Sequence, residues 1–240
     1  MLSELSGIDI WYLKLDRSVE PHDLSPAQLS VLSADEHLRA SQYPSKRDAT
    51  LFLASRILLR TSLSQYAKFS PELWTFGVTS TGRPLINSPD HEPQYHFNLS
   101  HTDGMVVCAI SRIQEIGIDV ENVHSRMISM AMAKKYLALA EFKNVENLGS
   151  EQRLRALLQY WTLKEAYAKA RGRGIGVPFT AIECELCDAD SDCSVRFFKG
   201  MDESSSAWFF RQIKLSEDHV CSLAYMSSLS KIIKLHEFKP

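Results

Sequence analysis

The pattern of apolar and polar positions predicts a chain in which strands and helices are mixed. Apolar residues that recur every three to four positions predict helices over residues 25–41, 45–66, 125–148 and 150–170. Short runs rich in apolar and aromatic residues predict strands over residues 8–15, 74–78, 95–101, 105–111, 116–121, 181–186, 194–198, 208–215 and 220–226. The closely spaced strands 105–111 and 116–121 indicate an antiparallel meander.

Capping signals refine the first helical segment. Ser25 is followed by Pro26 and Gln28, which is a sequence typical of a helix start, and Ser33 with Glu36 repeats the signal. Residues 25–41 therefore form either one bent helix or two short ones. A break near residue 140 is likewise an alternative for the helix over residues 125–148.

The two halves of the chain have similar predicted content, because each supplies helices and at least three strands. The sequence Gly-Ile-Asp-Ile at 7–10 resembles Gly-Ile-Asp-Val at 117–120. Trp11 stands where the second copy has Glu121, so only the second copy carries two acids. A short internal repeat of this kind suggests two related halves.

Composition limits the classes of function. The chain has 240 residues, 45% of them hydrophobic and 23% charged, with a formal net charge of −2, as in ordinary globular proteins. No global basic field draws it to nucleic acid or to an anionic membrane. We expect a cytoplasmic protein, because the first residues lack a signal pattern, no apolar run is long enough to span a membrane, and the five cysteines are an odd number.

A zinc site at Cys184, Cys187 and Cys193 is not expected, because no fourth ligand has suitable spacing.

Two acids in the predicted strand 116–121 are candidate metal ligands. Residues two apart in a strand share a face, so Asp119 and Glu121 point the same way. Paired carboxylates are oxygen ligands suited to Mg2+. The alternative for this pair alone is a solvated strand face without a ligand.

The predicted helix 150–170 carries a second candidate pair. Glu165 and Lys169 are four residues apart, a spacing typical of a surface ion pair that contributes only ~0.3–0.5 kcal/mol. Trp161 lies one turn before Glu165 among the apolar positions, which places Glu165 at the edge of the buried face. A carboxylate there could instead be a third metal ligand or a general base.

Basic residues gather around the predicted helix 45–66: Arg39, Lys46, Arg47, Arg56 and Arg60. A solvated helical face and an anion-binding cradle are both consistent with them. No phosphate-binding glycine motif of the G-x-x-x-x-G-K-[ST] or G-x-G-x-x-G kind occurs in a suitable context.

Further along the first half, a turn and a strand end in groups that can bind phosphate. The turn at residues 81–84 fixes the backbone around Arg83, which precedes Pro84. Asn98, Ser100 and His101 follow at the end of a strand-like segment. Ser100 and His101 are not expected to act as a nucleophile pair, because neighbours in an extended segment point apart.

Four motifs taken in order indicate a family, which no single motif does. They are Gly-Arg-Pro at 82–84, Phe-Asn-Leu-Ser-His at 97–101, Gly-Ile-Asp-Val-Glu at 117–121 and Trp-Thr-Leu-Lys-Glu-Ala-Tyr-Ala-Lys at 161–169. In this order and spacing, the sequence closely resembles the 4′-phosphopantetheinyl transferases of the large, surfactin-synthetase-activating type.

The resemblance implies a fold and a reaction. The fold would be α+β, a pseudo-dimer of two similar α/β subdomains over residues 1–112 and 113–240, with the active site and coenzyme A in the cleft between them. The enzyme would transfer 4′-phosphopantetheine from coenzyme A to a serine of an apo acyl- or peptidyl-carrier protein. Adenosine 3′,5′-bisphosphate would be released, and the reaction would require Mg2+.

The resemblance also assigns roles in the second half. Asp119 and Glu165 would bind Mg2+, with Glu121 as a third ligand or the partner of a bound water. Glu165 would take the proton of the carrier serine, directly or through a water. Lys169 and Lys164 would face the pyrophosphate.

In the first half, the resemblance implies nucleotide contacts. Arg83 and Pro84 would contact the adenine nucleotide. Ser100 and His101 would hold its 3′-phosphate, with Arg39 and, as a second candidate, Arg47. Asn98 would be a further contact to coenzyme A. One departure is Glu36, which stands where some members have another lysine, so the phosphate clamp would be weaker or would use Arg47 or Arg56.

Partners follow from the same resemblance. Carrier proteins are usually acidic around the modified serine, so a basic or apolar surface should dock them. The stretch 126–143 is our candidate for part of this docking surface, and an ordinary amphipathic helix is the alternative.

We expect the protein to be a monomer. Two rival functions are a non-catalytic module that binds coenzyme A or a carrier, and a metal-dependent phosphohydrolase acting on nucleotides.

Overall fold

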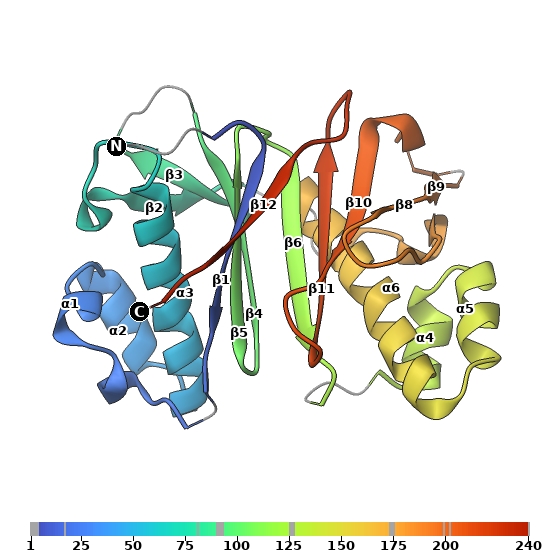
Figure 1. Cartoon of the computed structure of the whole chain (residues 1–240), viewed down its shortest axis with the longest axis horizontal. Helices are drawn as coiled ribbons and strands as arrows, with labels where there is room; N and C mark the ends of the chain where they lie inside the picture. The colour runs from blue at the N-terminus through green and yellow to red at the C-terminus, as the bar shows by residue number, and fades with distance from the viewer. Residues whose placement is uncertain are drawn as a thin grey trace. The chain divides into compact units, whose positions relative to one another are not determined.

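The computed structural model divides the chain into two compact units. It describes residues 5–16, 18–80, 82–89, 94–124, 128–172, 176–198, 200–201 and 203–239. The first unit comprises Met1–Arg112 together with Lys231–Pro240, and the second comprises Ile113–Ser230. The predicted division assigned all of 113–240 to the second subdomain, which needs correction for its last ten residues. They belong to the first unit because strand β12 (Ile233–Glu237) pairs with strand β1 (Ile8–Lys14) (Figure 1).

The first unit is built on a four-stranded sheet in the order β12-β1-β5-β4. β5 (Met105–Ser111) lies antiparallel to both β1 and β4 (His96–Thr102), whereas β12 is parallel to β1. A separate two-stranded ribbon joins β2 (Thr75–Val78) to β3 (Pro84–Ser88).

Three helices complete the first unit. The segment 25–41 forms two helices, α1 (Pro26–Leu29) and α2 (Ala34–Ser41), each begun by the predicted serine cap. The long helix α3 (Lys46–Leu63) packs on the sheet, and its apolar side chains form a buried core with those of β5. Two short 3-10 turns lie at Pro21–Asp23 and Pro71–Leu73.

The second unit has a four-stranded antiparallel sheet in the order β6-β11-β10-β8. Its strands are β6 (Ile116–Asn122), β8 (Asp192–Cys193), β10 (Trp208–Ile213) and β11 (His219–Met226). A ribbon of β7 (Ile182–Cys184) and β9 (Val195–Phe197) lies beside it.

Helix α6 (Ser150–Arg171) crosses this sheet and contacts β6, β11 and β10 (Figure 1). It ends at Gly172, whose φ of 61° is the left-handed conformation that glycine adopts at a helix end. The segment 125–148 gives two helices, α4 (Met130–Tyr136) and α5 (Leu139–Glu146), broken slightly before the expected position. Further 3-10 turns within the described residues lie at Phe179–Ala181 and Ser205–Ala207.

Both units follow one succession of elements. A strand is followed by helices that end in a long one, then by a two-stranded ribbon and a hairpin whose second strand pairs with the first strand. The sheet orders β1-β5-β4 and β6-β11-β10 correspond accordingly. The predicted α+β fold with two similar subdomains is therefore confirmed.

The cysteines and helices show two further features. Cys187 and Cys193 form a disulfide, whereas Cys184 is a free, buried thiol in β7, so the Cys-x-x-Cys pair does not act together. In the described part of the chain, no helix is both long and apolar enough to cross a membrane.

Candidate functional site

The predicted acid pair lies on β6, a strand with buried residues throughout. Asp119 is 6% exposed and Glu121 is 9% exposed. Asp119 is opposite Ser222 of β11, and Glu121 is opposite Val220. Residues opposite each other in an antiparallel pair point to the same face of the sheet, so Asp119 and Ser222 share a face. The Ser222 hydroxyl bonds to Thr162 of α6 at 2.6 Å, which shows that α6 covers this face. The acids therefore face α6, and a solvated strand face is excluded.

Lys169 connects α6 to the acid pair. Its ammonium donates to Asp119 Oδ1 at 2.7 Å and to the carbonyl oxygen of Ile118 at 3.1 Å. Lys169 is half-buried, and the Asp119 side chain is almost wholly buried. In this environment, a charge-assisted hydrogen bond is stronger than the exposed ion pair that the sequence spacing alone would suggest.

The approach of α6 to β6 depends on Gly117. A Cβ atom at this position would lie 2.0 Å from the carbonyl oxygen of Ala166 and 2.5 Å from the amide nitrogen of Ala170. No side chain fits there, so glycine lets the backbones of strand and helix touch. Sequence reasoning did not assign Gly117 a role, although its place in the Gly-Ile-Asp motif was visible.

Glu165 lies on α6 between Trp161 and Lys169, and all three are half-buried. The Trp161 ring packs edge-on against Tyr136 and Phe179, with centroids 5.6 and 6.1 Å away. Trp161 thus anchors this face of the helix against the core of the second unit, as predicted. Glu165 is at the edge of the buried region, where a carboxylate can be partly desolvated and still reached.

Lys164 needs a correction. The sequence placed it at the pyrophosphate, but its side chain is buried and its ammonium bonds to the Glu141 carboxylate. The carbonyl oxygens of Phe179 and Ile182 also accept from it, each at 2.8 Å. Adjacent helical residues point about 100° apart, so Lys164 turns inward while Glu165 does not. Lys164 is not available to a phosphate.

Glu141, which carries no recognisable motif in the sequence, completes this pair. Burial raises the pKa of its carboxyl, and the Lys164 ammonium and the backbone N–H of Cys184 act in the opposite direction. A fully buried acid opposite a fully buried lysine is invisible in the sequence, because their separation of 23 residues carries no periodic signal.

The basic residues of the first unit are mostly engaged. Arg56 and Arg60 both bond to Glu36, at 2.6 and 2.9 Å. Burial alone would raise the pKa of Glu36, but the Ser33 backbone N–H and the two guanidinium groups outweigh it and hold the pKa below its usual range. Arg47 bonds to Asp103 at 2.6 Å. The anion cradle suggested by the sequence is therefore largely an internal ion-pair network, and Arg56 does not serve as a phosphate ligand.

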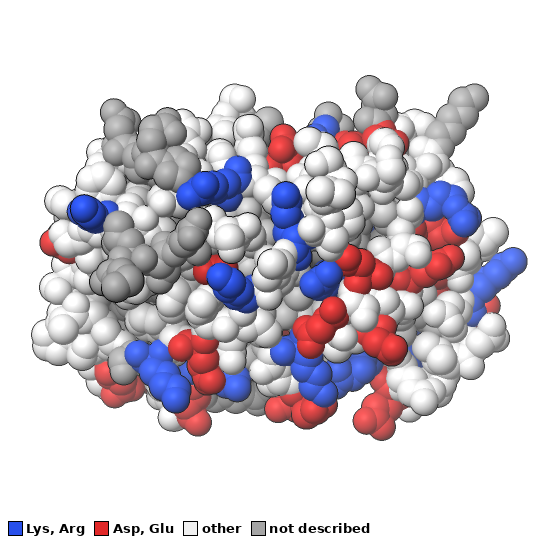
Figure 2. Space-filling view, turned by 45° about the horizontal axis from the view of Figure 1, so that its top comes forward, with Lys and Arg blue, Asp and Glu red and all other residues white. Residues whose placement is uncertain are grey.

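Arg39 differs from these. Its side chain is exposed, with the guanidinium 5.1 Å from the centre of the Phe52 ring. On the face drawn in Figure 2, lysines and arginines are interspersed with acidic side chains. Among the described residues of this face, no large patch of a single charge is seen.

The other nucleotide candidates lie on β3 and β4. Asn98 and Ser100 are buried on one face of β4, and His101 is exposed on the other, so Ser100 and His101 do point apart. Arg83 donates its backbone N–H to the Thr79 hydroxyl at 3.0 Å, which fixes the turn before Pro84 at the start of β3.

A metal ion at this site would need further ligands from the substrate or from water. Among the residues that the structure describes, no three His, Cys, Asp or Glu side chains form a metal-binding group. Asp119, Glu121 and Glu165 are thus not a preassembled three-ligand site. The donor set nevertheless fits Mg2+, which usually keeps waters and is held by one or two carboxylates plus substrate phosphates.

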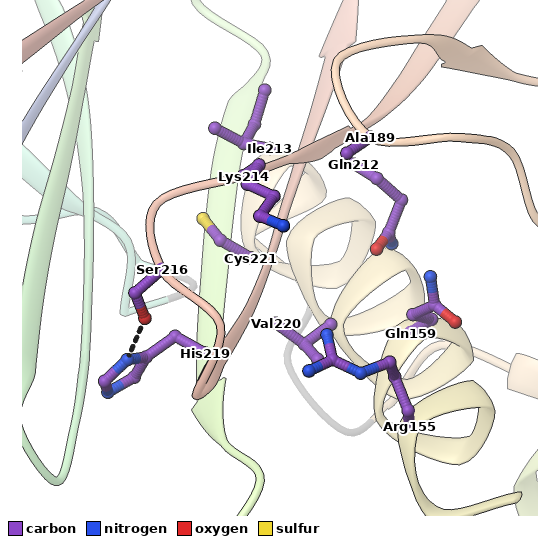
Figure 3. Close-up of a pocket in the computed structure, with 10 residues that line it drawn as sticks. All are labelled: Arg155, Gln159, Ala189, Gln212, Ile213, Lys214, Ser216, His219, Val220 and Cys221. Atoms are coloured by element: carbon purple, nitrogen blue, oxygen red, sulfur yellow. Dashed lines mark hydrogen bonds between the residues drawn. The ribbon is translucent and has the colours of Figure 1, made fainter. Parts of the chain in front are cut away.

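The second unit also contains a pocket that is partly open to solvent. It is lined by Arg155 and Gln159 of α6, by Gln212 and Lys214 around the end of β10, and by Val220 of β11, among others (Figure 3). None of the predicted site residues lines it, so it is a feature separate from the acid pair.

Comparison with known proteins places the whole arrangement in a family. The model of the 4′-phosphopantetheinyl transferase superfamily matches residues 115–224, and that of the 4′-phosphopantetheinyl transferase N-terminal region matches residues 20–113. The 4′-phosphopantetheinyl transferase HetI of Nostoc sp. (strain PCC 7120) is 32% identical over 168 residues, which are 70% of each chain. The 4′-phosphopantetheinyl transferase Sfp of Bacillus subtilis is 25% identical over 200 residues, 79% of this chain and 86% of that one.

A solved structure is also similar in part. The holo-[acyl-carrier-protein] synthase of Thermotoga maritima is 19% identical, with a TM-score of 0.37, over 49% of this chain and 65% of that one. The two family models and the HetI match show that the chain belongs to the 4′-phosphopantetheinyl transferase superfamily and is an enzyme of that class.

Proposed function

We propose that the chain moves 4′-phosphopantetheine from coenzyme A to a serine of an apo acyl- or peptidyl-carrier protein. Adenosine 3′,5′-bisphosphate is the other product, and the reaction requires Mg2+. The observation that carries this proposal is the buried acid pair of β6 with Lys169 bonded to Asp119 Oδ1. Two acids and a lysine gathered on a buried face suit a charged pyrophosphate better than they suit a structural core.

Mg2+ would be held by Asp119 and Glu165, with Glu121 as a further ligand or as the partner of a bound water. When bound, the ion neutralises phosphate charge and orients the group that is transferred. The packing at Gly117 supports this assignment, because it keeps α6 directly against β6 and limits how far Glu165 can move from Asp119.

Glu165 is the proposed general base. A serine hydroxyl is a weak nucleophile and needs an acceptor for its proton during attack. Glu165 lies at the edge of the buried region, so it can receive that proton directly or through a water. Lys169 then has a second role, since its ammonium can exchange Asp119 for a pyrophosphate oxygen and stabilise the charge that develops there.

The nucleotide part of coenzyme A is assigned to residues of the first unit. We assign contacts with the adenine nucleotide to Arg83 and Pro84, and its 3′-phosphate to Ser100 and His101, with Asn98 as a further contact to coenzyme A. Arg39 is preferred over Arg47 as the arginine for this phosphate. The reason is that Arg47 already bonds to Asp103, whereas Arg39 is exposed.

For the carrier protein we propose the exposed side of α4 and α5. Lys134, Lys135 and Lys143 are exposed there, together with Leu139, which is 70% exposed. Basic and apolar groups side by side suit an acidic helix with an apolar stripe. The upstream part of the predicted stretch, including Arg126, lies outside the described residues. We propose a monomeric, cytoplasmic enzyme.

The test is a transfer assay with purified protein, coenzyme A, Mg2+ and an apo carrier, read by intact mass. The expected result is a mass gain of one phosphopantetheine on the carrier, with equimolar adenosine 3′,5′-bisphosphate. Carriers of fatty-acid and peptide-synthetase type are both included. No gain on any of them would contradict the proposal, and phosphate release without a carrier would identify a phosphohydrolase instead.

A further inference from the structure

The ion pair of Glu141 and Lys164 lies behind the face of α6 that carries Glu165 and Lys169. The Lys164 side chain is 1% exposed, as is that of Glu141. Lys164 has three N–H groups, and four oxygens surround them: a Glu141 carboxylate oxygen, the carbonyl oxygens of Phe179 and Ile182, and that of Tyr136 at 3.3 Å. The ammonium is therefore fully satisfied and fixed in direction.

Glu141 is fixed equally firmly. Its Oε2 accepts from the backbone N–H of Ala138 at 2.8 Å as well as from Lys164, and its Oε1 accepts from the backbone N–H of Cys184 at 2.8 Å. One carboxylate thus joins the start of α5, strand β7 and α6. The pair ties four separate segments of the second unit to a single point on α6.

Stability alone does not explain why the pair is ionic. Taking two charges out of water is costly, and well-packed apolar residues in place of a buried ion pair often give equal or greater stability. What hydrogen bonds in fixed directions add is a unique arrangement of the segments that they join.

The geometry of the helix shows what this arrangement holds. Successive helical residues are about 100° apart around the axis, so Lys164 and Ala166 lie on either side of Glu165. Lys169 lies on nearly the same face as Glu165. On the Lys164 side, α6 is held by the ion pair, and on the Ala166 side it abuts Gly117 of β6. These two contacts hold α6 on both sides of the face that carries Glu165 and Lys169.

We propose that Glu141 and Lys164 are positioning residues that fix the rotation of α6 and thereby aim Glu165 and Lys169 at the reacting groups. The inference rests on the proposed function for the roles of Glu165 and Lys169. Both side chains are buried behind α6, so neither Glu141 nor Lys164 is expected to touch substrate. Their effect on the rate is indirect, through the angle of the helix.

The experiment compares a double apolar variant, Glu141→Leu with Lys164→Met, with the wild-type chain. We expect its urea midpoint to return close to that of the wild type, whereas the single variants unfold at lower urea because each leaves a buried charge unpaired. We expect kcat of the double variant to fall about 10- to 100-fold, the loss typical of supporting residues, with KM for coenzyme A changed less than about threefold.

A matched control is the ion pair of Arg211 and Asp192 in the same unit, which joins β10 to β8 at 2.7 Å. The neighbouring Phe210 stacks on Tyr167 of α6, so the Arg211 side chain points to the other face of the sheet. The double variant Arg211→Met with Asp192→Leu should keep the wild-type kcat. A Glu141→Leu, Lys164→Met protein with wild-type stability and wild-type kcat would overturn the proposal.

A second measurement does not depend on activity. The indole signal of Trp161, assigned in an NMR spectrum by the variant Trp161→Phe, reports the helix angle, because the ring packs against Tyr136 and Phe179. We expect this signal to shift in the double variant and to stay in place in the control. If the wild type shows no transfer to any carrier, the proposed function fails, but an unshifted Trp161 signal is what would overturn the positioning role.

Discussion

Asp9 of β1 and Asp119 of β6 occupy corresponding places in the two units. Each follows Gly-Ile in the first strand of its sheet, and they are 3% and 6% exposed. Each accepts a hydrogen bond from a residue near the C-terminal end of the unit's long helix: Tyr66 lies three residues beyond the end of α3, and Lys169 lies in the last turn of α6. For Asp9 the donor is the hydroxyl of Tyr66 at 2.6 Å, and for Asp119 it is the ammonium of Lys169 at 2.7 Å. One structural plan therefore holds a buried aspartate in both units.

The groups that surround the two aspartates differ. Tyr66 also accepts from the Trp11 indole N–H at 2.8 Å, His236 of β12 lies 3.1 Å from Asp9, and its ring stacks on Trp11. Trp11 takes the place that Glu121 holds beside Asp119. The first unit thus surrounds its aspartate with aromatic and hydrogen-bonding groups, whereas the second adds a second acid and a lysine. We infer that the first unit uses its aspartate for stability and the second uses its own for chemistry.

The largest effect expected from this comparison is on the transfer rate. Asp119→Asn should lower kcat/KM about 100-fold or more, a loss typical of removing one electrostatic contact to the transition state, and Glu165→Gln should do the same. Both variants should remain folded, and Asp119→Asn should lose only the part of its stability that the bond from Lys169 supplies. The equivalent change Asp9→Asn should have the opposite pattern, with near wild-type transfer and a free energy of unfolding lower by about 1–3 kcal/mol. Wild-type rates in Asp119→Asn would contradict the metal-site assignment.

The second prediction concerns Gly117 and Gly7, the glycines that precede Ile-Asp in β6 and before β1. Gly117→Ala places a Cβ 2.0 Å from the Ala166 carbonyl oxygen, so α6 must shift away from β6. We expect kcat to fall about 10- to 100-fold, because displacement of catalytic groups by about 1 Å has that effect. Gly7→Ala meets the carbonyl oxygen of Ile232, at 2.2 Å, in the segment before β12.

Since that segment carries no proposed catalytic residue, Gly7→Ala should lower the urea midpoint and leave kcat within about threefold, an effect on packing alone. Steady-state kinetics and urea unfolding of both variants provide the comparison. Equal losses of kcat in the two would remove the distinction between the units.

The third prediction tests the aromatic network. Burial and the Asp9 carboxylate raise the pKa of the Tyr66 hydroxyl well above its ordinary value, so it acts as a donor throughout the physiological range. Tyr66→Phe removes its hydrogen bonds to Asp9 and from Trp11. We expect a loss of about 1–3 kcal/mol in the free energy of unfolding and a transfer rate within about twofold of the wild type. A large fall in rate at unchanged stability would show that the first aspartate also takes part in the chemistry.

The smallest effect concerns acid stability in the first unit. The folded-state pKa of Glu36 is lowered, so the carboxylate contributes stability that is present above its usual pKa of 4.5 and is lost as the pH falls through the lower folded-state value. Urea unfolding between about pH 5 and about pH 3 should therefore show a steeper loss for the wild type than for Glu36→Gln, with a difference on the order of 1 kcal/mol. Parallel curves would show that Glu36 is not part of the acid response.

The sequence predicted the elements with strong local signals, but the meander expected from strands 105–111 and 116–121 is wrong, because the two strands belong to different sheets. The strand over 105–111 has the observed bounds, and the serine caps at Ser25 and Ser33 begin helices as expected. β12 was missed, because its parallel pairing with β1 joins residues more than 200 positions apart and leaves no local pattern.

The candidate site was also predicted only in part from the sequence. The spacing of Asp119 and Glu121 predicted a shared strand face, and the register with β11 confirms it. Lys164 was misassigned because a lysine beside Glu165 looks equally polar whether it points to solvent or to a buried partner. Only the packing of α5 and β7 against α6 shows that Glu141 receives it.

The most direct test of the central claim is the binding of Mg2+ itself. Isothermal titration of Mg2+ into the enzyme with coenzyme A present would measure it for the wild type, Asp119→Asn and Asp9→Asn. We predict one ion per chain in the wild type and in Asp9→Asn, and affinity at least about tenfold weaker in Asp119→Asn. Equal Mg2+ affinity in the wild type and Asp119→Asn would contradict the claim that the acids of β6 hold the ion.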